Sequence, residues 1–272
     1  MKLETVLITI IFFISTRVFS QNIFSDHHEE NFAFEVKQID EFIERFNNRE
    51  NTLLREYIKT NYPEAKIDRT SLIKGLFNQA DTTWDAVQLN QFIEKVTNFS
   101  SPAFLSFYDK DWYAEVDCQF IYHGEDEEAT LILLVQPEKD GASKWVITSA
   151  KADFLRLPGY QDSTKSLNPI SHATDFMGLD KALSDQENLL NYFRRDFKND
   201  LLTAFIYEVK NGSLKFKQVN NIIYHFLQID GWILTIEQFA RNSRNSGWLI
   251  SSLVKVSEEE KRMYKKSVLN IE

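Results

Sequence analysis

The sequence predicts an α+β fold in which helices pack on curved antiparallel meanders, and in which this helix-backed unit occurs twice in tandem. Three observations lead to this prediction. Residues Val219–Val256 show the apolar alternation and turn residues of a three-stranded meander. An earlier stretch, Trp112–Ser149, shows the same pattern. Segments with the apolar spacing of amphipathic helices precede each meander.

The later meander is the more clearly marked of the two. Its dipeptide Asp230-Gly231 separates two apolar runs, and it favours a type I′ hairpin turn because both central positions of that turn need a positive φ. Apolar and polar residues then alternate over 232–237, as expected of a half-buried strand. The polar segment 241–247 predicts a second turn, and 248–256 a third strand.

The two meanders resemble each other in detail. Trp145 and Trp248 each open a third strand, and the loops before them, 138–144 and 241–247, are equal in length. We interpret this as one supersecondary unit used twice. The alternative is that any two meanders share Trp and β-branched residues.

Apolar residues at helical spacing predict the helices. The predicted helical segments are 39–46, 53–58, 72–77 and 84–96 before the first meander, and 189–197 and 201–209 before the second. The second group begins after a predicted capping box at 184–187, and Asn211-Gly212 ends it. Segment 258–266 is highly charged and predicts a solvated helix.

The N-terminus has the features of a secretory signal peptide. Residues 1–20 contain one Lys followed by an apolar core that is too short to span a membrane. The chain is therefore expected to be exported, periplasmic or secreted, without a membrane span after cleavage; the alternative is an uncleaved anchor. A flexible N-terminus (21–34) and a first α+β domain (35–156) are predicted next. A Pro-punctuated linker (157–170) and a second α+β domain (171–272) follow.

Composition excludes several function classes. The formal net charge of −9 disfavours binding to nucleic acid, because like charges repel a phosphate backbone. Cys118 is the only cysteine, and we interpret it as a small buried hydrophobe. The common phosphate-binding, metal-binding and nucleophile motifs are absent, so neither a cofactor nor a metal is expected.

Helices followed by long antiparallel strands, with closing strands Trp145–Ser149 and Trp248–Ser252, resemble the NTF2-like (cystatin-like α+β) superfamily. The resemblance implies tandem NTF2-like units over about 35–156 and 170–257. Domains of this superfamily form a cone whose mouth often binds a small molecule. Some members are isomerases or dehydratases that use an acid or a His–Asp pair inside the cone, and many are non-catalytic. No such pair is placed on this sequence, so no functional residue is transferred.

Three titratable residues are the catalytic candidates: His172, Asp175 and His225. A His beside an Asp can act as a general base, and His172 and Asp175 would adjoin if their segment were helical. His225 lies on a predicted strand, where the alternative is a core histidine with satisfied hydrogen bonds.

Aromatic and Arg residues gather near one end of the later meander, and both types are enriched at protein interfaces. These binding candidates are Tyr224, Trp232, Arg241, Arg244 and Trp248. The alternative for the Trp residues is a place in the core.

The sequence favours a non-catalytic exported binding or structural module that recognises a partner protein or a cell-envelope component. A small-molecule ligand is also allowed. The alternative is a small-molecule enzyme of the NTF2-like type that uses acid–base chemistry.

Overall fold

The computed structural model describes residues 30–139, 142–155, 157, 167, 179–193 and 200–271. The predicted signal peptide, residues 1–20, lies outside them, as does most of the predicted flexible N-terminus. Of the predicted linker, only residues 157 and 167 are described. Among the helices described, none has the length and apolar character that a bilayer crossing needs.

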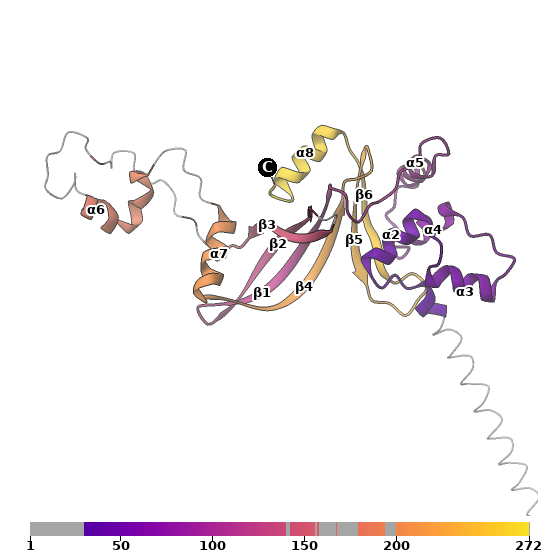
Figure 1. Ribbon diagram of the computed structural model, residues 1–272, viewed down its shortest axis with the longest axis horizontal. Helices are drawn as coiled ribbons and strands as arrows, with labels where there is room; N and C mark the ends of the chain where they lie inside the picture. The colour runs from indigo at the N-terminus through magenta and orange to yellow at the C-terminus, as the bar shows by residue number, and fades with distance from the viewer. Residues whose placement is uncertain are drawn as a thin grey trace, which may run out of the picture.

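Six strands form one antiparallel sheet in the order β3-β2-β1-β4-β5-β6 (Figure 1). The strands are β1 (Trp112–Tyr122), β2 (Glu125–Pro137), β3 (Ser143–Lys151), β4 (Leu214–Phe226), β5 (Trp232–Phe239) and β6 (Gly247–Lys255). The α+β class and both antiparallel meanders are thus confirmed. The prediction of a type I′ turn is wrong: that turn needs a positive φ at both central residues, but only Gly231, with a φ of 79°, has one, and Asp230 does not. Strand β4 ends at Phe226, and Trp232 donates its N–H to the Ile229 carbonyl (3.0 Å) across the turn before β5.

Two tandem units are not confirmed. The meanders join along β1 and β4, which pair antiparallel from Trp112 opposite Phe226 to Tyr122 opposite Leu214. Two separate sheets would each leave the edge of β1 or β4 unpaired, with exposed N–H and C=O groups. Pairing β1 with β4 satisfies these groups. The strand order is symmetric about the β1–β4 pair, with Trp145 and Trp248 on the outermost strands. The division into 35–156 and 171–272 stays a prediction.

Four helices precede the first meander: α2 (Ile39–Asn47), α3 (Leu53–Asn61), α4 (Arg69–Gly75) and α5 (Ala86–Thr97). Of these, α2, α4 and α5 pack against the second meander (Figure 1). Thr52, Asp68 and Asp85 cap α3, α4 and α5 by accepting first-turn N–H groups. The shared core includes Phe42, Phe92 and Ile250. The sequence pattern predicts these helices, and α4 begins three residues before the predicted 72–77 because Asp68 caps it.

The helix α7 (Leu201–Asn211) instead covers strands of the first meander. Its Phe205 ring lies edge-on to Phe120 of β1 at 5.4 Å. Asp200 caps the helix, and Gly212, in the left-handed conformation, ends it as predicted. Before it come α6 (Leu179–Ser184) and a 3-10 helix, η1 (Gln186–Tyr192). The predicted capping box at 184–187 is wrong, since the Ser184 hydroxyl donates to Asp180 within α6.

The C-terminal helix α8 (Glu258–Ser267) packs on the opposite face of the sheet. Consecutive residues of β1 point to opposite faces of the sheet, and they show which helices cover each face. Trp112 belongs to the core that includes α2, α4 and α5, and Tyr113 belongs to the cluster under α8. Helix 258–266 is confirmed, and most of its side chains are exposed as predicted. Lys261 is an exception: it is buried and donates to the carbonyl oxygens of Leu227 (3.0 Å) and Ile229 (2.9 Å).

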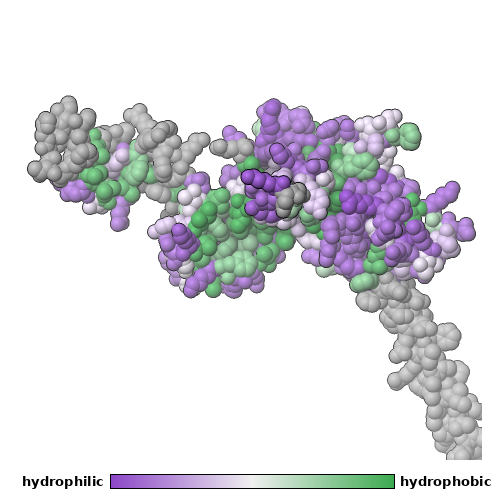
Figure 2. Space-filling view, in the orientation of Figure 1, coloured by the Kyte–Doolittle hydropathy of each residue, from purple (hydrophilic) through white to green (hydrophobic). Residues whose placement is uncertain are grey.

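Polarity differs along the molecule. Figure 2 shows hydrophobic surface over the strands beside α7, whereas the region of α2–α5 is largely hydrophilic on this face. A cavity within that hydrophilic region is therefore set apart from the exposed apolar surface of the sheet.

Candidate ligand-binding cavity

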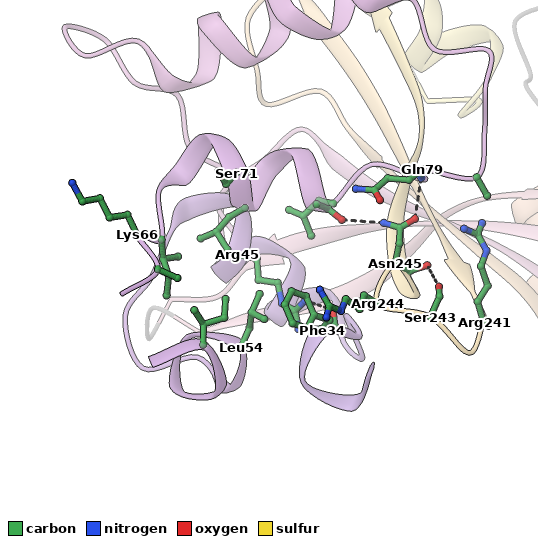
Figure 3. Close-up of a pocket in the computed structure, with 17 residues that line it drawn as sticks. Phe34, Arg45, Leu54, Lys66, Ser71, Gln79, Arg241, Ser243, Arg244 and Asn245 are labelled. Carbon is green, nitrogen blue, oxygen red and sulfur yellow. Dashed lines mark hydrogen bonds between the residues drawn. The ribbon is translucent and has the colours of Figure 1, made fainter. Parts of the chain in front are cut away.

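A cavity of about 660 Å³ lies between helices α2–α4 and the loop that joins β5 to β6, residues 240–246 (Figure 3). Its walls are mainly apolar. The apolar lining includes Phe34, Leu54, Ile58, Ile67, Leu72 and Leu76. The cavity is thus built from two regions that are far apart in the sequence, residues 34–80 and 241–245.

The first wall is an N-terminal arm, residues 30–37, attached to the start of β6. Val36 donates its N–H to Ser246 (3.1 Å), and its carbonyl accepts from Trp248 (2.8 Å). Gly247 makes this approach possible: its φ is 84°, and an added Cβ would lie 2.0 Å from the Val36 carbonyl oxygen. The arm can lie this close to β6 only because residue 247 is glycine.

Arg45 of α2 holds the arm from inside. Its side chain is 5 % exposed. The guanidinium donates to the carbonyls of Ala33 (3.1 Å), Phe34 and Glu35 (2.7 Å), and it pairs with Glu41 at 2.5 Å. Burial lowers the pKa of Arg45, and Glu41 opposes that shift. Because its donors serve the arm, Arg45 is mainly structural, although Nε has no hydrogen-bond partner among the described residues.

Asn245 fastens the β5–β6 loop to α4 and the residues after it. Its amide donates to the carbonyls of Gly75 (3.1 Å) and Phe77 (2.9 Å), and its oxygen accepts from the Gln79 N–H (2.9 Å) (Figure 3). One side chain thus satisfies three backbone groups, which holds two sides of the cavity at a set separation.

Two predicted binding residues, Arg241 and Arg244, line the cavity. Arg241 donates to the Asn78 side-chain oxygen at 2.6 Å and lies 4.7 Å from the Phe239 ring centroid. Arg244 pairs with Glu30. Every charged residue in the described part of the lining is cationic, and the remaining two are Arg45 and Lys66. The cavity therefore has mainly apolar walls and cationic polar groups.

Two further binding candidates lie in the core, as the alternative for the Trp residues predicts: Trp232 is 3 % exposed and Trp248 is 8 % exposed. Burial of this extent leaves the two Trp rings little surface for a partner. The half-buried Tyr224 ring packs against Trp248 at 4.9 Å. Sequence reasoning missed Arg45 and Asn245, because a charged or polar residue in a polar stretch gives no signal of burial.

His225 lies under α8 and does not line this cavity. It is 4 % exposed, its Nδ1 lies 2.7 Å from the Tyr264 hydroxyl, and its Nε2 lies 3.5 Å from Glu115 Oε2. Interaction with His225, followed by the charge of Lys151, lowers the pKa of Glu115 against the opposing effect of burial. The other two catalytic candidates, His172 and Asp175, lie outside the described residues. The fold brings His225 close to Glu115 and Tyr264, and the sequence predicted neither of these as its neighbour.

We expect ionisation of Tyr264 to lower the unfolding free energy of the protein at alkaline pH. Burial, and then the charge of Glu115, raise the pKa of Tyr264 to about 12. An unfolded Tyr ionises near pH 10, so between about pH 10 and 12 the unfolded state loses a proton that the folded state keeps. The stabilising contribution is present below this window and is lost as pH rises through it. In Tyr264→Phe this alkaline drop in unfolding free energy should be smaller than in the native chain. The difference should be less than about 3 kcal/mol, because solvent screens a half-buried group.

Urea unfolding at about pH 9 and about pH 11 measures this effect. The difference in unfolding free energy between the two pH values should be smaller for Tyr264→Phe than for the native chain. Equal differences would contradict the role assigned to Tyr264. Tyr207→Phe is a control, since Tyr207 is 63 % exposed on α7.

Cys118 is buried as predicted. Burial, aided by the charge of Asp117, raises the pKa of its thiol, which disfavours a nucleophilic thiolate. Among the described residues, no group of three His, Cys, Asp or Glu side chains is arranged to hold a metal ion.

Comparison with protein-family models, with curated proteins and with solved structures found no match to this chain.

Proposed function

We propose that this chain is a non-catalytic binding module whose ligand occupies the cavity between α2–α4 and the β5–β6 loop. The carrying observation is the cavity itself: about 660 Å³, within the usual range of small-molecule sites, with apolar walls and a few placed polar groups. A ligand gains affinity there from the apolar surface that it and the walls remove from water.

The cavity is held open by the fold. Arg45 fixes the N-terminal arm, Gly247 lets the arm approach β6, and Asn245 fixes the β5–β6 loop. A site whose walls are already fixed loses little conformational entropy when the ligand enters, which favours affinity.

The residues of the lining support binding over catalysis. Among the described residues, the lining includes neither His nor Cys, and neither Asp nor Glu. Arg stays protonated at physiological pH and is a poor general acid or base. The described lining therefore offers no imidazole, thiol or carboxylate for proton transfer or nucleophilic attack.

Export and tandem organisation belong to the same proposal. The apolar core of residues 1–20 supports delivery outside the cytoplasm, where the ligand would be a component of the cell envelope or part of a partner protein. The symmetric strand order supports two related NTF2-like units that have merged into one sheet.

An acid–base enzyme of the NTF2-like type is the second candidate. The observation in its favour is His225 with Glu115 at 3.5 Å and Tyr264 at 2.7 Å. Helix α8 covers this group, so a substrate would need α8 to move. Loss of a measured activity in His225→Gln, with an unchanged melting temperature, would favour this candidate.

Fluorescence of the neutral probe N-phenyl-1-naphthylamine tests the binding proposal. Gly75 lines the cavity, and an added Cβ there would meet no heavy atom within 4 Å. We expect the native chain and Gly75→Ala to bind the probe equally, and Gly75→Phe to bind it at least about tenfold more weakly because the ring fills the space.

A second variant, Leu72→Asn, makes the wall polar without adding bulk and should also weaken probe binding. Thermal melting checks that each variant is folded. Unchanged probe affinity in both folded variants would show that the cavity is not the site, and the proposal would be abandoned.

A further inference from the structure

We infer that the cavity binds a single-chain amphiphile with an anionic head group, of the class of medium- and long-chain carboxylates. This inference rests on the proposed function and adds the chemical class of its ligand. It depends on three observations: the sign of the charge in the cavity, the cation that lacks a carboxylate partner, and the aliphatic character of the walls.

The charge in the cavity is opposite to that of the whole chain. The protein has 40 acidic and 31 basic residues, yet the described residues of the lining include four cations and no carboxylate. In an acidic protein, a local cationic lining attracts anions and repels cationic ligands. The bound group is therefore expected to carry negative charge.

The four cations are not equivalent. Arg45 donates to three carbonyls and pairs with Glu41, and Arg244 pairs with Glu30. The Lys66 side chain extends away from the other labelled residues in Figure 3.

Arg241 is the cation available to a head group. Its recorded side-chain contacts are with neutral groups: the Asn78 amide oxygen and the Phe239 ring. No carboxylate of the described residues lies within 4.0 Å of it. A guanidinium presents five N–H donors in a planar fork that matches a carboxylate. Arg241 can keep its bond to Asn78 and still bind such a group.

The walls suit a flexible hydrocarbon chain. Five of the apolar lining residues are aliphatic Leu or Ile, contributed by α3, by α4 with the residue after it, and by residue 67; Phe34 is the one aromatic residue of the lining. In Figure 3, Leu54 and Lys66 lie on one side, and Arg241 and Asn245 on the other. The head group is thus placed at the β5–β6 loop, and the chain between α3 and α4.

Displacement of N-phenyl-1-naphthylamine by three amphiphiles of equal chain length tests the inference. We use dodecanoate, dodecan-1-ol and dodecyltrimethylammonium, each below its micelle-forming concentration. Dodecanoate should displace the probe at least about tenfold better than the alcohol, and the cation should be the weakest. Between octanoate and dodecanoate, affinity should rise by about fourfold per methylene, since each buried methylene contributes about 0.8 kcal/mol.

Arg241→Gln should remove most of the advantage of dodecanoate over dodecan-1-ol while leaving the affinity for the alcohol nearly unchanged. Arg244→Gln is the matched comparison, because Glu30 already offsets that charge, and it should reduce the advantage less. A thermal melt accompanies each variant. Where Arg241→Gln does not fold, Arg241→Lys replaces it and should keep part of the advantage.

The outcomes separate the two proposals. If the probe occupies the cavity but all three amphiphiles displace it equally, the anionic class is wrong and the binding module stands. If the probe does not enter the cavity, the proposed function fails first. Displacement only by a peptide with a free C-terminal carboxylate would overturn the inference. Cosedimentation with phosphatidylglycerol vesicles that depends on Arg241 would also overturn it, since it would place the head group in a membrane.

Discussion

Gly247→Ala is expected to destabilise the protein by about 4 kcal/mol or more. An alanine in the left-handed conformation costs about 1–2 kcal/mol by itself. The new Cβ would also lie 2.0 Å from the Val36 carbonyl oxygen, and backbone cannot rotate away as a side chain does. The arm would therefore separate from β6, with loss of two backbone hydrogen bonds and exposure of buried Val36.

Denaturant unfolding measures the change, and probe fluorescence should fall with it because Phe34 of the arm lines the cavity. Gly231→Ala is the matched control. Gly231 has a similar φ of 79°, but its added Cβ would be 3.8 Å from the nearest backbone atom. We expect it to lose about 1–2 kcal/mol and to keep probe binding. Equal losses in the two variants would show that the close approach at Gly247 contributes nothing.

Arg45→Met should reduce the unfolding free energy by about 3–5 kcal/mol. The substitution preserves much of the side-chain volume but leaves three carbonyls of the arm and the carboxylate of Glu41 without their donor. Removing one member of a buried pair costs more than the pair contributes, because the remaining charge is left desolvated.

The comparison for Arg45 is Arg262→Met on α8. Arg262 also pairs with a Glu on its own helix, Glu259, but both side chains are mostly exposed. Solvent screens such a pair, so its loss should cost less than about 1 kcal/mol. A change at Arg45 as small as that at Arg262 would refute its structural role in holding the arm.

Local pattern explains which parts of the fold were predictable. Strand alternation and helical spacing depend on residues a few positions apart, so both meanders and α2, α3, α5 and α7 could be predicted from the sequence. The turn at Asp230-Gly231 was the exception. There, only Gly231 has the positive φ that a type I′ turn requires at both central positions.

The candidate site was only partly predictable. Arg241 and Arg244 were identified because Arg residues in a polar loop are accessible in any fold. Arg45 was missed because its surroundings, 40–50, read as the charged side of an amphipathic helix. Trp232 and Trp248 were binding candidates, but both belong to the core that the strands share with helices from the N-terminal part of the chain.

By itself, the sequence determined the kinds of elements, their order and their apolar faces, since these follow from side-chain periodicity and turn chemistry. Only the tertiary structure decided that β1 pairs with β4, that α2, α4 and α5 cover β4–β6, and that α8 covers the other face. Periodicity shows that a face must be buried but does not specify what buries it. The cavity between α2–α4 and the β5–β6 loop depends on that choice of partners, because two distant regions of the chain must meet to form it.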